Sequence, residues 1–346
     1  ETGRPVETIN NDYNETAQIV LPSPVGGHNW MPMAFSPLTE LVYIPAIDLP
    51  HTYAGDPQYP HIGADWQTGT NPSYAATPKE IGPDVERALL KKLAQARLIA
   101  WNPKTQTSAW SVEHKHPWNG GVLATGGNLV FQGDALGFFS AYTADTGTLL
   151  WQQAANTGIV AAPISYSIDG EQYVAVLAGW GGSMALFGGE ANRLAQGGVT
   201  GRMLVYKLGA NGLAPAGFAV QERELPTSKS LEGVTQAQLT NGFDLYNAHC
   251  MVCHGFGVVG GGLIPDLRYV NDATYQIFER IVGEGLLAPV GMPSFAGRLG
   301  EQEILNIKAY VTREAMRERE DRNDPDWWRA TKQTLGMAVA WLLTSL

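Results

Sequence analysis

The sequence predicts two parts of different fold class, an all-β region over residues 1–210 and an all-α domain after it. Three observations predict this order. Short apolar runs between Gly turns recur at a fixed spacing in the first part, apolar residues recur at helical spacing in the second, and both cysteines fall in the second. The length of 346 residues also suggests two domains, at about 150 residues each.

The composition excludes several classes of protein. Forty Gly and ten Trp are typical of β structure with many tight turns and large buried rings. Charged residues are 16% and hydrophobic residues 44%, which excludes a wholly disordered chain. The net charge is −10, so we expect no nucleic-acid partner, because phosphate binding requires clustered Lys and Arg. No apolar run reaches the roughly 20 residues that a membrane-spanning helix needs.

The β region contains a repeat. Residues 100–105 align with 141–146, and Trp110 with Trp151, at an offset of 41 residues. Three short apolar runs and a fourth ending in Trp151 lie within one repeat, and four strands in about 41 residues are typical of one β-propeller blade. Weaker copies begin at Met33 and Ala161, so the sequence predicts a partial propeller of about three blades. The alternative is a β-sandwich with chance Trp spacing.

Three blades cannot close a ring, because closed propellers have at least about four. The Thr2-Gly3 pair matches the turn at Thr146-Gly147, which places Glu1 inside a blade. The sequence has no initiator Met and no signal peptide. We therefore expect the C-terminal part of a longer propeller protein.

Two segments interrupt the repeat. Residues 48–92 have little periodicity and predict a long excursion between strands. The spacing of their polar side chains predicts solvated loop residues and no metal site: His51, Asp56, His61 and Asp65. Residues 211–230 are rich in Pro, Ala and Gly and predict the linker to the helical domain.

Both cysteines belong to one pentapeptide, Cys250-Met251-Val252-Cys253-His254. This C-x-x-C-H pattern is the attachment site of c-type haem. The two thiols, one helical turn apart, can form thioethers to the haem vinyl groups, and His254 then lies beneath the iron as an axial ligand. A redox dithiol does not require the His, and a zinc site would need two further ligands at matching spacing, which we do not find.

The sixth iron ligand is predicted in the string Gly291-Met292-Pro293-Ser294-Phe295. Met292 lies in a Gly/Pro loop, whereas most Met side chains only fill cores. Met251 is less suited, because it lies between the two cysteines. Ligation by His254 and Met292 raises the reduction potential of the iron.

Helical patterns surround these motifs. Apolar spacing predicts helices over residues 274–282 and 299–311, and a leading helix over residues 235–249 has Thr235 as its candidate N-cap. The order helix, C-x-x-C-H, helix, Met, helix resembles a class I cytochrome c domain, which we place at residues 231–322. Haem attachment of this kind occurs outside the cytoplasm, so we expect a periplasmic protein, soluble or peripherally membrane-associated.

The C-terminal tail, residues 323–346, is predicted to be an amphipathic helix that starts at Asp324-Pro325-Asp326. Its apolar run, residues 335–343, is too short to span a bilayer. Trp327, Trp328 and Trp341 suit a membrane interface or a groove on another subunit. The alternative is that the helix packs on the protein's own domains.

Repeat, haem motif and three further strings together resemble the quinohaemoprotein alcohol dehydrogenases, periplasmic enzymes that use pyrroloquinoline quinone (PQQ). Besides the repeat, four strings carry the resemblance: the haem motif at residues 250–254, and residues 27–34, 157–163 and 291–295. The resemblance covers nearly the whole chain apart from about the last twenty residues. It implies an eight-bladed propeller that holds PQQ and a calcium ion on its axis, with an Asp as base. It also implies that electrons pass from the quinone to haem c and then to an external acceptor, a cytochrome, a blue copper protein or a quinone.

By this resemblance, Asn29 and Trp30 match an Asn-Trp pair that contacts the quinone. Ile159 and Val160 would approach it through backbone groups. The alternatives are a turn residue for Asn29, blade packing for Trp30 and an ordinary buried strand for the other two. We assign three further rings to blade packing: Trp101, Trp110 and Trp151.

The family's calcium ligands, catalytic Asp, PQQ-contacting Lys and adjacent-cysteine disulfide cannot be placed in this sequence. We therefore expect no catalytic residue in it and no activity from it alone. The expected substrate is a small primary alcohol, oxidised to an aldehyde. The alternatives are a cytochrome that relays electrons while fused to a non-catalytic propeller binding scaffold, and a quinoprotein for sugars or polymeric alcohols.

Overall fold

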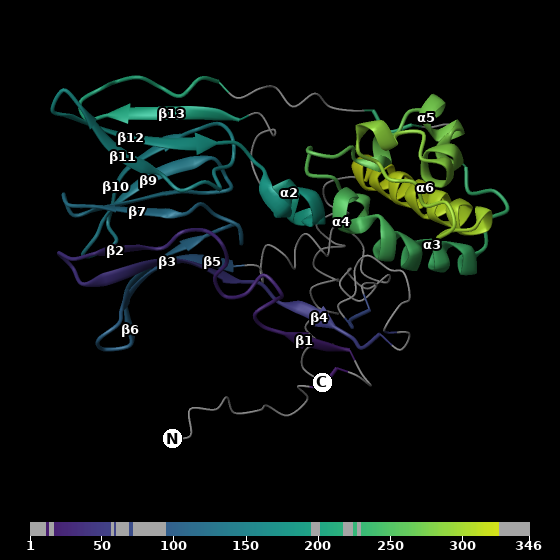
Figure 1. Cartoon of the computed structure of the whole chain (residues 1–346), viewed down its shortest axis with the longest axis horizontal. Helices are drawn as coiled ribbons and strands as arrows, with labels where there is room; N and C mark the ends of the chain where they lie inside the picture. The colour runs from purple at the N-terminus through teal and green to yellow at the C-terminus, as the bar shows by residue number, and fades with distance from the viewer. Residues whose placement is uncertain are drawn as a thin grey trace.

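The computed structural model describes residues 12–13, 17–56, 59, 69–71, 95–194, 201–216, 224–226 and 230–324. Three antiparallel sheets are stacked on one side of the molecule, and a group of helices lies on the other, as Figure 1 shows. The sequence predictions for Thr2-Gly3, for His61 and Asp65, and for the tail from Pro325 onward fall outside the described residues.

The first sheet has the strand order β2-β3-β5-β6. Its strands are β2 (Ala34–Ser36), β3 (Leu41–Asp48), β5 (Gln95–Asn102) and β6 (Thr107–His114). The predicted excursion therefore leaves the sheet after β3 and returns at β5. Within it, β4 (His51–Tyr53) pairs with β1 (Gln18–Val20).

The second and third sheets follow the predicted repeat. The second contains β7 (Val122–Thr125), β8 (Leu129–Gly133), β9 (Phe138–Thr143) and β10 (Leu149–Ala154), each paired with the next. The third has three strands, β11 (Ile164–Ile168), β12 (Glu171–Ala178) and β13 (Arg202–Lys207). Three consecutive antiparallel sheets confirm the prediction of about three propeller blades.

Apolar side chains between neighbouring sheets form the core of this region. Tyr43 and Leu98 of the first sheet pack with Val130 and Tyr142 of the second. The Trp110 ring, at the end of the first sheet, contacts the turn of the second, where its Nε1 donates to the carbonyl oxygen of Ala144 at 3.0 Å. This contact confirms blade packing for Trp110.

The segment between β12 and β13 was missed by the sequence analysis. It forms the helix α2 (Gly182–Phe187) and the 3-10 helix η2 (Gly189–Leu194). The helix α2 lies between the sheets and the helical domain (Figure 1), and η2 contacts the helical domain. The predicted linker, residues 211–230, is held near both of its ends. Gln153 Nε2 donates to the Gly212 carbonyl, and Arg319 Nη1 donates to the Pro226 carbonyl.

The helical domain begins with α3 (Gln236–His249), followed by α4 (Met251–His254). Thr235 is the N-cap, as predicted, and forms a capping box with Gln238. Short 3-10 helices follow: η3 (Phe256–Val258), η4 (Leu267–Tyr269) and, later, η6 (Ala288–Val290). None of the helices among the described residues is both long enough and apolar enough to cross a membrane.

The two remaining predicted helices differ from expectation in their bounds. The first is divided into α5 (Asp272–Gln276) and the π-helix η5 (Arg280–Glu284), which ends at Gly285 in the left-handed conformation. The second, α6 (Glu301–Asn323), continues well past the apolar run. Charged side chains continue α6 because Arg and Glu are good helix formers. Phe278, Ile304 and Ile307 all face the core of this domain, in agreement with the apolar spacing.

Candidate functional site

The C-x-x-C-H motif lies where α3 passes into α4. Cys250 is the residue between the two helices, and Cys253 and His254 complete α4. The Cys250 side chain is buried, that of Cys253 is exposed, and neither forms a disulfide. The motif therefore presents one thiol in the domain interior and one at its surface, on a single helical turn.

The environment of Cys250 argues against the other interpretations of the motif. Burial raises the pKa of the Cys250 thiol to about 12, and the neighbouring Cys253 adds to this shift. A redox-active cysteine needs the opposite, a lowered pKa that provides a thiolate. The described residues contain no group of three or more His, Cys, Asp or Glu side chains placed to hold a metal.

The ring of His254 is oriented by a backbone carbonyl. Its Nδ1 lies 3.0 Å from the carbonyl oxygen of Pro265, and a carbonyl can only accept, so Nδ1 donates the proton. This hydrogen bond leaves Nε2 unprotonated and able to bind a metal, the arrangement typical of axial His ligands. Burial lowers the pKa of His254, which favours the neutral ring that binds iron.

Met292 lies in a loop that hydrogen bonds fix to the rest of the domain. Its amide donates to the Leu287 carbonyl at 3.2 Å, and the amide of Phe295 donates to Val282 at 2.8 Å. The Met292 side chain packs against the same core cluster that contains Cys250. The Met292 thioether and the Cys250 thiol thus contact the same apolar core. Together with His254, these side chains are suited to hold a covalently bound haem.

An ion network that sequence reasoning missed supports the loop after η3. Arg268 is 4% exposed and contacts Asp266 at 2.5 Å and Glu318 of α6 at 3.0 Å. Asp266 also accepts from the amide of Gly260. This network lies directly beyond Pro265, so it holds the carbonyl that orients His254. Charge spacing could not have revealed it, because Arg268 and Glu318 are 50 residues apart.

Asn29 and Trp30 form part of a tight turn beside the propeller. Asn29 Nδ2 donates to the Val25 carbonyl at 2.8 Å, and Asn29 Oδ1 accepts from the Trp30 amide at 2.8 Å. These contacts are typical of a turn residue, but they use only one of the two Nδ2 hydrogens of Asn29. Trp30 is 61% exposed, so its side chain does not pack in the interior of a blade. Its exposed face is therefore open to a ligand.

Trp118 was also missed. Its ring lies 6.3 Å from that of Trp30, and the residue is only 1% exposed. Its indole Nε1 is buried without a hydrogen-bond partner among the described residues. A buried polar group without a partner is costly, so this N–H next to Trp30 is suited to an acceptor on a bound ligand. The only sequence signal is an aromatic residue just before Asn119 and the Gly120-Gly121 pair.

Ile159 and Val160 occupy different environments. Ile159 is completely buried, and its amide donates to the Asp134 carbonyl at 2.8 Å. Its side chain also fills the space beside Gly133, where a β-carbon would lie 2.2 Å away. These contacts match the buried-strand alternative, so Ile159 offers no free amide. Val160 is partly buried and packs against the core cluster of Trp118 and Met184.

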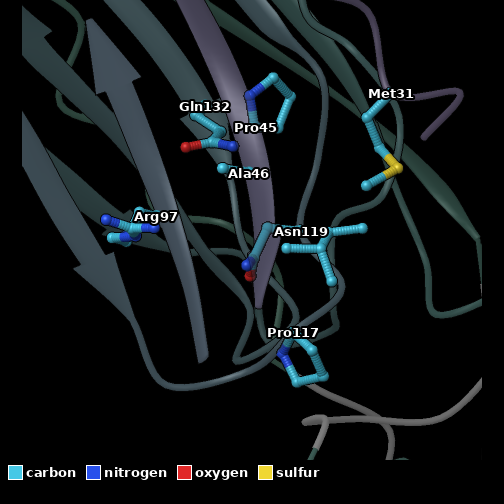
Figure 2. Close-up of a pocket in the computed structure, with 8 residues that line it drawn as sticks. Met31, Pro45, Ala46, Arg97, Pro117, Asn119 and Gln132 are labelled. Atoms are coloured by element: carbon cyan, nitrogen blue, oxygen red, sulfur yellow. The ribbon is translucent and has the colours of Figure 1, made fainter. Parts of the chain in front are cut away.

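A small hollow lies beside Met31, the residue after Trp30. Its empty space of about 150 Å³ includes open solvent, and it is lined by residues that include Met31, Asn119 and Gln132 (Figure 2). Cofactor sites usually enclose about 300–1,000 Å³. The hollow is therefore too small to enclose a three-ring quinone by itself.

Comparisons with known proteins give two family matches. Residues 5–174 match the family described as glucose/ethanol/alcohol dehydrogenase, beta-propeller domain. Residues 237–311 match the family described as cytochrome C oxidase, cbb3-type, subunit III. Both matches agree with the division into a propeller region and a cytochrome c domain.

Similar proteins contain both parts. The quinohemoprotein alcohol dehydrogenase ADH IIB of Pseudomonas putida is 43% identical over 90% of this chain and 43% of its own length. The 1-butanol dehydrogenase (cytochrome c) of Thauera butanivorans is 34% identical over 90% of this chain and 44% of its own. The solved structure of quinohemoprotein alcohol dehydrogenase ADHIIG from P. putida HK5 superposes with a TM-score of 0.79 at 35% identity, covering 91% of this chain and 45% of that one. The chain thus spans less than half the length of these relatives.

Proposed function

Because the chain belongs to the quinohaemoprotein alcohol dehydrogenases, we propose that its whole protein oxidises alcohols to aldehydes and passes the electrons through haem c to an external acceptor. The observation that carries this proposal is the C-x-x-C-H turn, with Cys250 buried and His254 oriented by Pro265, in a domain that packs against a PQQ-type propeller.

The residues of the helical domain hold and tune the haem. Cys250 and Cys253 form the two thioethers, which keep the haem attached when the protein is reduced or diluted. His254 would bind the iron through Nε2, while its Nδ1–H donates to the Pro265 carbonyl. Met292, fixed by its loop, would supply a thioether ligand to the iron, and a Met ligand raises the reduction potential.

The turn at Trp30 supplies part of the quinone site. When bound, PQQ would supply the two-electron oxidation of the alcohol, and haem would supply one-electron transfer to the acceptor. The exposed ring of Trp30 offers a flat apolar contact, and the second Nδ2 hydrogen of Asn29 and the buried Nε1 of Trp118 offer donors. We propose these three residues as the quinone contacts of this chain, with Val160 beside them, and a calcium ion and base supplied by other residues of the whole protein.

The substrate we propose is a small primary alcohol, in keeping with the name of the T. butanivorans relative, 1-butanol dehydrogenase (cytochrome c). The same name supports a cytochrome as acceptor, and a blue copper protein or a quinone would serve the same chemistry. We propose a periplasmic location, because haem is attached to C-x-x-C-H motifs outside the cytoplasm. If the C-terminal tail docks on a membrane, deletion of residues 325–346 should move the protein from the membrane fraction to the soluble fraction. Unchanged fractionation would favour the alternative, in which the tail packs on the protein's own domains.

Alcohol-dependent reduction of the haem tests the function. The purified holoenzyme, oxidised and without external acceptor, is mixed with 1-butanol, and reduction is followed in the haem absorption bands. We expect the reduced spectrum, because each alcohol releases two electrons and two protons and each ferric haem takes one electron. A spectrum that stays oxidised while aldehyde forms would contradict the electron route. Under denaturing electrophoresis the haem should stay with the chain and should be lost from the Cys250→Ala, Cys253→Ala double variant.

A further inference from the structure

The propeller region and the helical domain meet through α2, which packs directly against the haem-binding helix α4 (Figure 1). We propose that the backbone contact between Ala185 of α2 and Gly261 sets the distance between the quinone site and the haem, and with it the rate of electron transfer between them. This inference rests on the proposed function. Gly261 is therefore a positioning residue and does not itself touch the reacting groups.

The contact is unusually close because no side chain separates the two backbones. A β-carbon at Gly261 would lie 2.2 Å from the carbonyl oxygen of Ala185 and 2.9 Å from its Cα. Real β-carbons do not approach that closely, so an Ala at this position would force the two segments apart. Ala185 itself is 1% exposed and belongs to the propeller-side core of Trp118 and Met184, so it cannot yield freely.

A second contact of the same kind lies close by. Gly189, at the start of η2, has a φ of 53°, and a β-carbon there would lie 2.8 Å from the carbonyl oxygen of Phe256. The haem-side partners, Phe256 and Gly261, follow the predicted iron ligand His254 by a few residues. The propeller therefore touches the haem domain at the loop that leaves the axial ligand, and it does so at two glycines, one from each side.

The other end of α2 lies against the predicted quinone contact. A β-carbon at Gly182 would lie 3.1 Å from Cζ2 of Trp30. The six residues of α2 span about 9 Å at 1.5 Å per residue. One short rigid element thus runs from the Trp30 ring to the segment after His254. Any shift at Gly261 changes the separation of the two sites directly.

Two substitutions from opposite sides of the interface test the proposal in the holoenzyme. Gly261→Ala changes the helical domain, and Gly189→Ala changes the propeller side, so failure of one variant to fold leaves the other. Gly181→Ala is the matched control, because Gly181 adjoins α2 in extended backbone and a β-carbon there meets nothing within 4 Å. Each variant is mixed with 1-butanol, and haem reduction is timed by stopped flow.

We expect haem reduction to slow on the order of tenfold in both test variants, because small misplacements of reacting groups have effects of this size. Phenazine methosulfate, which takes electrons from the quinone directly, should be reduced at the wild-type rate. Hydrogen–deuterium exchange should speed up in peptides covering residues 182–187 and 255–262. The control should match the wild type in all three measurements.

Three results would overturn the proposal. Haem reduction at the wild-type rate, despite faster exchange at the interface, would show that this contact does not set the electron-transfer distance. Unchanged exchange would show that the two segments do not press on each other. Slower reduction of the dye as well would place the effect at the quinone site. If 1-butanol fails to reduce haem even in the wild-type holoenzyme, the proposed function fails instead, and the exchange measurement still reports on the contact.

Discussion

The backbone amide of Trp118 donates to Nδ1 of His116 at 3.0 Å. The opposite ring nitrogen, Nε2, lies 3.1 Å from the carbonyl oxygen of Ala191, which can only accept. The His116 ring is therefore neutral, with its proton on Nε2, and it ties the Trp118 segment to η2. Burial lowers the pKa of His116 to about 4, although its hydrogen bonds act in the other direction.

This arrangement predicts acid sensitivity of the propeller region. His116 has a pKa of 6.5 when unfolded, so below that pH the unfolded chain binds more protons than the folded one. The free energy of unfolding should therefore fall as the pH drops from 6.5 toward 4, by up to about 3 kcal/mol from this group. His116→Gln should lack this part of the pH dependence. Urea denaturation of both proteins between pH 4 and 8 measures it, and a constant difference at every pH would refute the assignment.

Replacement of Met292 should change the haem without releasing it. Met292→Ala should lower the reduction potential and abolish the weak red absorption band of Fe–S(Met) ligation, because the soft thioether is lost. The control is Met251→Ala, which removes another Met that packs on the same core. Redox titration with absorption spectra measures both effects. Equal effects of the two variants would rule out Met292 as the iron ligand.

The buried Glu318 should contribute far more to stability than an exposed Glu with a similar partner. Glu318 is 4% exposed and pairs with Arg268 and Arg322. Glu318→Ala removes one partner of the buried Arg268, so it should lower the free energy of unfolding by about 3 kcal/mol. Glu284 pairs with Arg280 at the surface, and Glu284→Ala should cost below about 1 kcal/mol. Denaturation in guanidinium chloride, followed by the haem absorption bands, compares the stability of the two variants. Similar costs would mean that the buried network adds no stability.

The turn at Gly147 should not tolerate a side chain. Its φ is 69°, and a β-carbon would lie 2.6 Å from the Trp110 ring, so Gly147→Ala should cost about 2–4 kcal/mol from backbone strain and displaced packing. Gly170 has a φ of 82° with nothing within 4 Å, so Gly170→Ala should cost only the backbone part, about 1 kcal/mol. Thermal unfolding by circular dichroism measures the difference. If both variants are destabilised equally, the contact with Trp110 makes no contribution to the effect of Gly147→Ala.

Local sequence determined the elements whose signals lie within a few residues. Thr235 predicts the start of α3, because its hydroxyl accepts from the Gln238 amide and the Gln238 side chain accepts from the Thr235 amide, within one turn. The repeat predicts the second sheet because strand and turn residues alternate at fixed spacing. Cys250 to His254 specify haem attachment through their own order, whatever the surrounding fold.

Only the tertiary structure decided the contacts between distant segments. The helix α2 has no periodic signal, because its six residues are too few to show one and Gly182 favours other conformations. The roles of Gly261, Arg268 and Trp118 depend on partners far away in the chain, a backbone carbonyl, a Glu in α6 and the ring of Trp30. The sequence predicts Ile159 as a site residue through its backbone, but only the tertiary structure shows that its side chain is buried and its amide is bonded to Asp134. Sequence patterns record what a residue can do chemically, whereas burial and close approach arise only when separate segments pack together.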